Sequence, residues 1–283
     1  MAGSFHRNEV VDDAGSVPVR DAATVLIVRD APDLEVLMVQ RASRLAFAAN
    51  AWVFPGGRVD QSDAAHASKV GVNLDDRAAS DMLDVGQGGL AWWFAAIRET
   101  LEEVGLLLGA GHVDPALVGG LRAALDDTGS EAFSGLLGER GHLLDLSTVH
   151  EVARFVTPIG PARRFDTRFF LASAPAEQVP THDESEIVAT RWMRPADAMD
   201  AWRAGEMELM AVTHRMLACL DRFESAAAAL ECAASRPPAA RLRVDDPEGQ
   251  YVVFLPGEPG YDDAELEIEH GSIRLWRPDS SPA

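Results

Sequence analysis

The sequence predicts an α/β fold in which a β-sheet is layered with helices. Two observations indicate this class. Apolar, β-branched segments alternate along the chain with segments of helical periodicity, and 47% of the 283 residues are hydrophobic, as is ordinary for a packed core. No internal repeat is found. We expect one principal domain over residues 18–215 and a smaller C-terminal appendage, a helix with β-structure, over residues 216–283.

Two short apolar segments near the N-terminus predict paired strands. Residues 22–29 and 35–40 are rich in Val, Leu and Ile, and a turn-like stretch with Asp and Pro separates them, so we expect a hairpin or adjacent strands. The stretch VFPGG, residues 53–57, then predicts a strand end that runs into a tight glycine turn.

An acidic helix follows after an insert. Residues 61–90 are polar and Ala-rich, with a short helix expected near 74–84, and we interpret this stretch as an insert. A helix is then predicted from about 91 to 104, and Gly105 directly after it fits a C-terminal cap.

The rest of the chain alternates helices and strands. Strand patterns are found at 152–157, 168–172 and 187–193, and C-terminal β-structure is expected at 251–261 and 265–278. Helical periodicity marks the segments 112–147, 195–207 and a long Ala-rich run from 208 to 234.

Charge and hydropathy exclude several kinds of partner. Asp and Glu number 45 against 25 Lys and Arg, and the net charge of −20 argues against a long nucleic acid, whose binding depends on neutralised phosphates. No apolar run approaches the ~18 residues of a membrane span, and the N-terminal residues lack the apolar core of a signal peptide. Cys219 and Cys232 form no disulfide framework. We expect a soluble, cytoplasmic protein; no feature indicates its oligomeric state.

Three carboxylates share one face of the predicted acidic helix. Glu99, Glu102 and Glu103 lie at helical spacing, with Arg98 as the nearby cation. Like charges at this spacing destabilise an isolated helix by roughly 0.2–0.5 kcal/mol per pair. The cluster is either a solvated acidic surface or a site for a hard divalent cation such as Mg²⁺ or Mn²⁺, which prefers oxygen ligands.

The run from Arg98 to Leu106, RETLEEVGL, matches the second half of the Nudix box, R-E-U-x-E-E-x-G-U with U aliphatic, except for Thr100 at the first U. The chain therefore resembles the Nudix hydrolase family. In the standard box, counted from Gly57, a Glu falls at position 63 and the Arg at position 71; here Asp63 occupies the first position, and Arg98 lies about 27 residues later than standard. The resemblance implies an α/β/α sandwich with a mixed sheet and a helical insert inside the box.

The interrupted box, with segments 163–172, 186–199 and 254–261, resembles the insert-bearing Nudix subgroup that includes the animal peroxisomal coenzyme A diphosphatase. This resemblance implies a Mg²⁺ or Mn²⁺ cofactor and hydrolysis of a small diphosphate, most simply coenzyme A or acyl-coenzyme A, to 3′,5′-ADP and (acyl-)4′-phosphopantetheine. The upstream coenzyme A signature keeps its ends, Arg41 and FPGG, whereas Ala46 and Asn50 replace its second Arg and its Gly.

The resemblance also implies residue roles. Glu99, Glu102 and Glu103, with the backbone carbonyl of Gly56 or Gly57, are expected to hold the metal, and Arg98 to orient a neighbouring Glu or the glycine loop. Further expectations concern a general base at Glu184 or Glu186, phosphate binding by Arg41, Arg163 and Arg164, and stacking of an adenine on Phe165 or Trp192, which are otherwise core residues.

Two other functions stay open. One is pyrophosphatase activity on a different nucleoside diphosphate-X, such as a nucleotide sugar or ADP-ribose, because the box sets the reaction while loops and inserts set the substrate. The other is a catalytically silent Nudix-fold binding or regulatory protein. The intact Glu99, Glu102 and Glu103 argue against silence, whereas Asp63 keeps it open.

Overall fold

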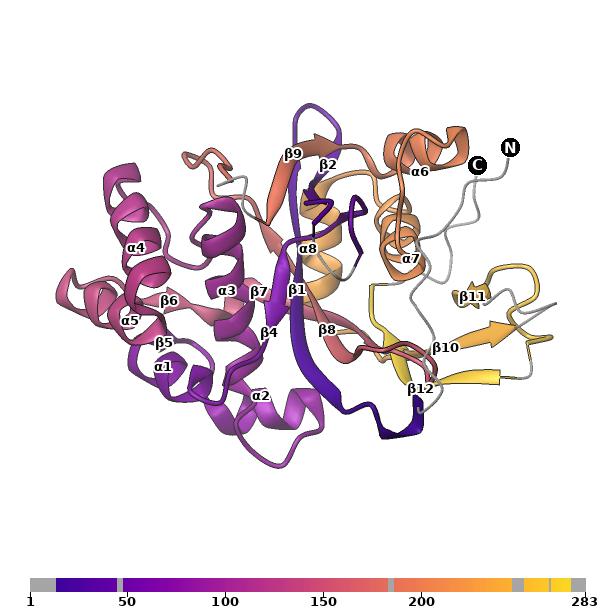
Figure 1. The fold of residues 1–283 in the computed structure, drawn as a ribbon, viewed down its shortest axis with the longest axis horizontal. Helices are drawn as coiled ribbons and strands as arrows, with labels where there is room; N and C mark the ends of the chain where they lie inside the picture. The colour runs from indigo at the N-terminus through magenta and orange to yellow at the C-terminus, as the bar shows by residue number, and fades with distance from the viewer. Residues whose placement is uncertain (1–13, 45–47, 183–185, 246–251, 265, 276–283) are drawn as a thin grey trace.

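A mixed sheet of ten strands forms the centre of the computed structural model, which describes residues 14–44, 48–182, 186–245, 252–264 and 266–275 (Figure 1). The strand order is β11-β10-β12-β7-β8-β1-β2-β3, with β4 paired to β1 and β9 to β2. β1 is parallel to β8 and antiparallel to β2 and β4. The strands are β1 (Val19–Asp30), β2 (Leu34–Arg41), β3 (Trp52–Val53), β4 (Gly56–Arg58), β7 (Val149–Val156), β8 (Arg164–Ser173), β9 (Ile187–Met193), β10 (Ala240–Asp245), β11 (Val252–Phe254) and β12 (Leu266–Ile273). β5 (Gly71–Val72) and β6 (Leu144–Asp145) form a separate parallel pair.

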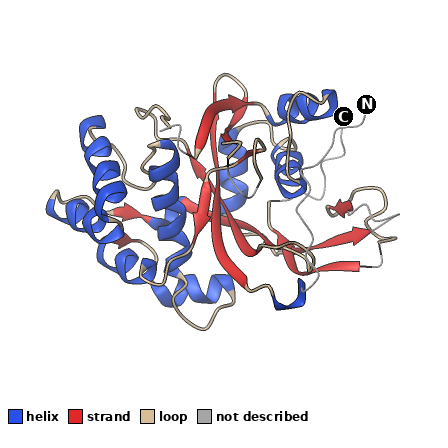
Figure 2. Ribbon diagram, viewed as in Figure 1, coloured by secondary structure: helices blue, strands red, loops and turns tan. Residues whose placement is uncertain are grey.

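Helices lie on both faces of the sheet, so the predicted α/β/α sandwich is confirmed (Figure 2). One group comprises α1 (Asp63–Val70), α2 (Asp76–Leu83), α3 (Leu90–Val104), α4 (Pro115–Thr128) and α5 (Ser130–Glu139); the other comprises α6 (Pro195–Ala204), α7 (Ala211–Leu220) and α8 (Ala226–Ala234). Short 3₁₀ turns span Ala14–Ser16 and Leu146–Thr148. Within the described ranges, no helix has the length and apolar character needed to cross a membrane.

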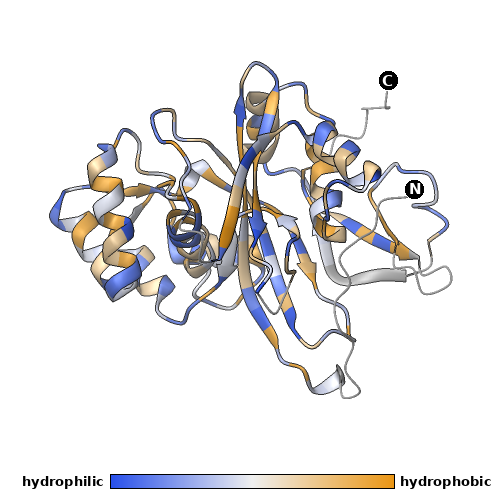
Figure 3. Ribbon diagram, turned by 45° about the horizontal axis from the view of Figure 1, so that its top comes forward, coloured by the Kyte–Doolittle hydropathy of each residue, from blue (hydrophilic) through white to orange (hydrophobic). Residues whose placement is uncertain are grey.

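The alternation of side chains along β1 divides the interior into two cores. Val25 and Ile27 are buried on the face that carries α3, while Leu26 and Val28 are buried on the face that carries α7 and α8. This follows from the two-residue period of a strand. Hydrophobic and hydrophilic residues alternate along the outer helices as well, as expected for helices with one face on a core (Figure 3).

The insert forms two helices rather than one. α2 (Asp76–Leu83) lies inside the predicted range 74–84, and Asp75 caps it by accepting a hydrogen bond from the Ala78 amide. α1, which the sequence pattern does not indicate, buries Ala67 and Val70 against the core around α3. The apolar face of α1 is narrow, and its sequence pattern is hard to distinguish from that of an Ala-rich loop unless the elements that pack on it are known.

The long helix predicted from 208 to 234 is wrong. The chain leaves α7 after Leu220, and Ser225 starts a new helix by accepting a hydrogen bond from the Ala228 amide. The Asp30 side chain, at the end of β1, accepts a further hydrogen bond from the Ala226 amide at 2.7 Å. Tertiary contacts therefore stabilise the break that local periodicity does not reveal.

The C-terminal strands continue the central sheet. β12 pairs with β7 through Ser272 and Ile273, and β10 pairs with β12. The sequence-based division at residue 216 falls inside α7, and buried residues from both sides of it, including Leu26 and Leu242, share one core.

Candidate active site

The acidic helix α3 is anchored by its apolar face. Phe94, Ile97 and Leu101 are fully buried in the core that α3 shares with β1, which leaves the intervening carboxylates along one edge. Thr100, the departure from the aliphatic box position, is also fully buried, and its hydroxyl donates to the Ala96 carbonyl at 2.7 Å. Its polar group is thereby satisfied inside the core, so the departure costs the helix little.

The glycine turn of β4 packs directly on these carboxylates. The Gly56 amide donates to Oε2 of Glu103 at 2.9 Å. A Cβ on Gly57 would lie 2.3 Å from the carboxyl carbon of Glu99, and a Cβ on Gly56, whose φ is +152°, would lie 2.3 Å from the Ala23 carbonyl oxygen. Glycine is required at both positions because the backbone itself forms the wall of the site.

Arg98 joins the helix to the start of the insert. Its buried guanidinium donates to Oε1 of Glu99 at 2.7 Å, to the Arg58 carbonyl at 2.8 Å, and to both carboxylate oxygens of Asp63 at 3.3 and 3.1 Å. It also reaches Glu102 at 3.4 Å. Asp63 is fully buried and accepts from the Asp60 amide. The residue at the interrupted box position therefore contacts the box arginine across the insert.

Burial raises the pKa of each helix carboxylate. The pKa of Glu103 is raised to about 8 by burial and then by the neighbouring charge of Glu99, and the pKa of Glu99 is raised to about 7, chiefly by burial and against the opposing effect of Arg98. Burial also raises the pKa of the half-exposed Glu102. A cation placed between Glu99 and Glu103 would stabilise both anions.

The donor set fits a hard divalent cation whose coordination water or phosphate oxygens would complete. Among the described residues, no three carboxylate, imidazole or thiolate side chains are placed to hold a metal ion by themselves. Mg²⁺ does not require one, because it is commonly bound by one or two carboxylates together with water and substrate phosphate oxygens. The carboxylates of Glu99 and Glu103, packed against the Gly56–Gly57 backbone, match that pattern.

Arg41 and Glu186 lie beside the carboxylate helix. Both act electrostatically on Glu103, Arg41 lowering and Glu186 raising the pKa of its carboxyl, and Glu186 also raises that of Glu102. Arg41 ends β2, and the Glu186 carbonyl accepts a hydrogen bond from the Ala42 amide at 2.8 Å. Glu184 lies outside the described residues.

The other two predicted phosphate-binding arginines are farther away. Arg164 pairs with Val19 on β1, whereas Gly56 pairs with Thr24. Five residues of extended strand separate these levels by about 16 Å. Arg164 donates to the Thr157 carbonyl, and the neighbouring Arg163 is exposed. The structure therefore does not bring this pair to the carboxylates, and a role on a more remote part of a substrate stays a prediction.

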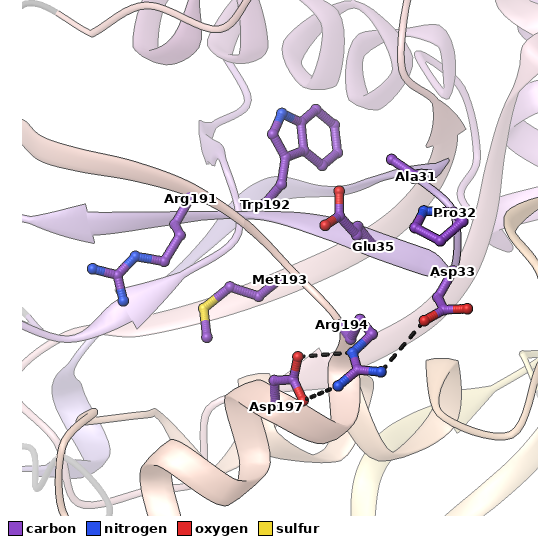
Figure 4. Close-up of a pocket in the computed structure, with 9 residues that line it drawn as sticks. All are labelled: Ala31, Pro32, Asp33, Glu35, Arg191, Trp192, Met193, Arg194 and Asp197. Carbon is purple, nitrogen blue, oxygen red and sulfur yellow. Dashed lines mark hydrogen bonds and ion pairs between the residues drawn. The ribbon is translucent and has the colours of Figure 1, made fainter.

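The two candidate stacking aromatics also lie apart from the carboxylates. Trp192 lines a hollow of about 350 Å³ near the β1–β2 turn, where Figure 4 shows Arg194 bound to Asp33 and Asp197. Arg29 stacks on the Trp192 ring at 4.1 Å. Phe165 follows Arg164 on β8, so it too lies at a level of the sheet far from Gly56.

Two residues have structural features that the sequence does not reveal. Asn50 departs in type from the coenzyme A signature, yet its φ of +63° is the left-handed conformation that glycine adopts most readily and Asn tolerates. Arg122, on α4, donates to the Glu102 carbonyl at 2.6 Å. No spacing rule in the sequence connects it to the box, because α4 reaches α3 only through the tertiary fold.

Comparison with known proteins finds a matching family model, similar sequences and a similar solved structure. A family model described as the NUDT19 Nudix domain matches residues 72–212. The acyl-coenzyme A diphosphatase NUDT19 of Gallus gallus is 29% identical over 263 residues, covering 73% of this chain and 69% of that protein, and its Xenopus laevis counterpart is 26% identical over 212 residues, covering 61% of this chain and 56% of that protein. The crystal structure of a NUDIX hydrolase from Alicyclobacillus acidocaldarius is similar at a TM-score of 0.63 and 31% identity, covering 76% of this chain and 97% of that one.

Proposed function

Because this chain belongs to the Nudix hydrolase family, we propose that it cleaves the diphosphate linkage of coenzyme A or an acyl-coenzyme A with the aid of Mg²⁺ or Mn²⁺. The products would be 3′,5′-ADP and 4′-phosphopantetheine or its acyl form. The observation that carries the proposal is the convergence of Glu99, Glu103 and the Gly56–Gly57 backbone on one edge of α3. A buried acidic cluster built against glycine is suited to a cation and an anionic substrate together.

Each carboxylate has a distinct part in the proposed reaction. Glu99 is oriented by Arg98 and Glu103 by the Gly56 amide, and these two carboxylates, with Glu102 and the Gly56 carbonyl, would hold the cation. The divalent ion, when bound, neutralises phosphate charge and lowers the pKa of bound water. Arg98 keeps the cluster aligned through Asp63, which serves here where the standard box has Glu.

Glu186 and Arg41 complete the proposed site from outside the helix. The carboxylate of Glu186 accepts a proton from the attacking water, and the Arg41 guanidinium binds a phosphate oxygen. Both residues act electrostatically on Glu103, which supports this assignment.

A cytoplasmic location stays a prediction.

The choice of coenzyme A rests on the relatives and on the upstream segment. The two NUDT19 proteins are named as acyl-coenzyme A diphosphatases. In this chain Arg41 keeps its place in the corresponding signature, and the positive φ of Asn50 preserves a glycine-like turn. Both features support coenzyme A over other diphosphates.

A substrate panel tests the proposal. The purified protein, with MgCl₂ or MnCl₂, is incubated with coenzyme A, an acyl-coenzyme A, ADP-ribose, NADH and a nucleotide sugar, and the products are identified by mass. Release of 3′,5′-ADP from the coenzyme A species supports the proposal. Cleavage of another diphosphate alone would replace the substrate, and no cleavage with either metal would favour a binding protein.

A further inference from the structure

A loop between β8 and β9 lies against the C-terminal end of α3. The Thr181 amide donates to the Val104 carbonyl at 2.9 Å. Gln178 exchanges two hydrogen bonds with the backbone of Leu107: its Oε1 accepts from the Leu107 amide at 2.8 Å, and its Nε2 donates to the Leu107 carbonyl at 3.3 Å. Residues 178–181 are therefore attached to the helix that carries the acidic cluster.

Arg122 joins this loop to α3 from a third element, α4. Its Nη2 donates to the Glu102 carbonyl at 2.6 Å and reaches the Glu103 carbonyl at 3.5 Å, while its Nη1 donates to the carbonyl and the hydroxyl of Thr181 at 3.1 and 3.0 Å. The last carbonyls of a helix have no partner within the helix, and the guanidinium fork can serve several acceptors at once. The Arg122 side chain thus provides hydrogen-bond donors both to the carbonyls at the helix end and to Thr181 of the loop.

The glycine that closes the box makes room for this contact. Gly105 has a φ of +66°, and a Cβ there would lie 2.6 Å from the Thr181 hydroxyl and 3.2 Å from Nη1 of Arg122. Gly105 therefore does more than end the helix, because the absence of its side chain lets the loop and Arg122 close over the helix terminus.

We propose that Arg122 is a positioning residue, which fastens residues 178–181 to the end of α3 and thereby holds Glu186 opposite Glu102 and Glu103. Glu186 directly precedes β9 and lies five residues after Thr181, and its carbonyl accepts a hydrogen bond from the Ala42 amide. The inference rests on the proposed function, in which Glu186 is the general base. Arg122 touches no reacting atom and acts through the loop.

The first test measures the loop without reference to activity. Hydrogen exchange is compared in the wild type, Arg122→Ala, Arg122→Lys and Arg77→Ala, a matched control whose side chain is 93% exposed on α2. Exchange of the Leu107 and Thr181 amides should accelerate at least tenfold in Arg122→Ala and less in Arg122→Lys, with Arg77→Ala unchanged. Unchanged exchange in Arg122→Ala would overturn the proposal.

The second test asks whether Arg122 acts through Glu186. With coenzyme A and MgCl₂, Arg122→Ala should lower kcat at least tenfold and change KM less than twofold, with partial rescue by Lys. In the Glu186→Gln background, the same substitution should have little further effect, since residues that act as one unit are not additive. Fully additive losses, or an unchanged kcat in Arg122→Ala, would contradict the inference.

The outcomes of these experiments distinguish failure of the positioning role from failure of the proposed function. Loss of activity in Glu103→Gln with additive behaviour of Arg122 and Glu186 would leave the hydrolase proposal intact and remove only the positioning role. Activity that survives in Glu103→Gln would remove the proposed site, and the positioning role with it. If Arg122→Ala does not fold, Arg122→Lys and Thr181→Val carry both tests.

Discussion

The three carboxylates of α3 differ in what holds them. Glu103 accepts a backbone hydrogen bond from Gly56, Glu99 is paired with Arg98, and Glu102 is half-exposed with a longer contact to Arg98. Identical side chains within one helical turn therefore have different freedom to move. The two that are held firmly are the ones we assign as the principal metal ligands.

Glu103→Gln should lower kcat roughly 100-fold or more, because it removes a charged ligand, while preserving the fold. The amide oxygen can still accept from Gly56, and loss of the repulsion with Glu99 should leave the melting temperature of the metal-free protein equal or higher. Steady-state kinetics and thermal unfolding measure the two effects. Glu139→Gln, exposed at the end of α5, is the control; wild-type turnover in Glu103→Gln would falsify the metal assignment.

Arg41→Ala should raise KM for coenzyme A about tenfold, since a hydrogen bond between charged groups contributes about 1.5–3 kcal/mol. Arg164→Ala should change it less, because Arg164 lies at a different level of the sheet and donates to Thr157. Comparing both variants with coenzyme A and its 3′-dephospho form separates the positions. A larger effect of Arg164→Ala, confined to coenzyme A, would instead assign it to the 3′-phosphate.

At the scale of elements, the insert leaves β4 and α3 in contact because it loops out between these two parts of the chain. α1 and α2 stand between β4 and α3 in the chain, yet Asp63 at the start of α1 meets Arg98 in α3. Other pairs of helices are held by similar local contacts. The α6–α7 pair, for example, packs Trp202 on His214, with ring centroids 4.4 Å apart.

His214 should make stability depend on pH between about 6.5 and 4. Burial, followed by the charges of Arg215 and Arg203, lowers the pKa of His214 to about 4 from its ordinary 6.5. As the pH falls through 6.5, the unfolded chain takes up a proton at His214 that the folded protein does not. The free energy of unfolding therefore falls, by an amount on the order of 2 kcal/mol. This loss of stability ends near pH 4, where the folded protein also takes up the proton.

Urea unfolding of the wild type and His214→Gln from pH 8 to 4 measures this effect. The wild type should lose more stability than the variant over the window from 6.5 to 4. Parallel curves for the two proteins would show that His214 does not carry the dependence.

At the scale of the whole molecule, a buried ionic network joins the C-terminal segment to the sheet. Glu151 on β7 is 4% exposed and lies 3.2 Å from Arg236, 3.2 Å from Arg274 and 3.9 Å from Arg168. Arg168 and Arg236 also donate to the carbonyls of Leu83 and Met82 at the end of α2. The network thus ties the insert, the sheet and the C-terminal segment together.

Glu151→Gln should destabilise the protein by about 3 kcal/mol, because it leaves buried guanidinium groups without their counter-charge. Unfolding should remain a single transition by fluorescence and circular dichroism, since residues on both sides of position 216 share one core. Glu177→Gln, at an exposed pair with His112, is the control. Two separated transitions in the wild type would support the division at residue 216 instead.

The sequence alone determined the features that depend on local pattern. Strands near 22–29, 35–40 and 187–193, the acidic helix and its Gly105 cap follow from periodicity and backbone preference within a few residues. The spacing of the Nudix box also identified Asp63 as the residue at the first Glu position. Its contact with Arg98 could not be derived, because the insert separates the two residues in the sequence. Within the long Ala-rich run, the same local reasoning missed the break before Ser225, because Asp30 helps to stabilise it from the far end of β1.

Only the tertiary structure decided which distant residues meet. It brings Arg41 and Glu186 to the acidic helix, keeps Arg164 at another level of the sheet, sets Arg122 against the end of α3 and adds β12 to β7. These contacts depend on strand register and on how helices pack over the sheet, and both are set by burial of apolar surface over the whole chain. Residue type and local spacing carry no information about which of several arginines that packing brings to the carboxylates.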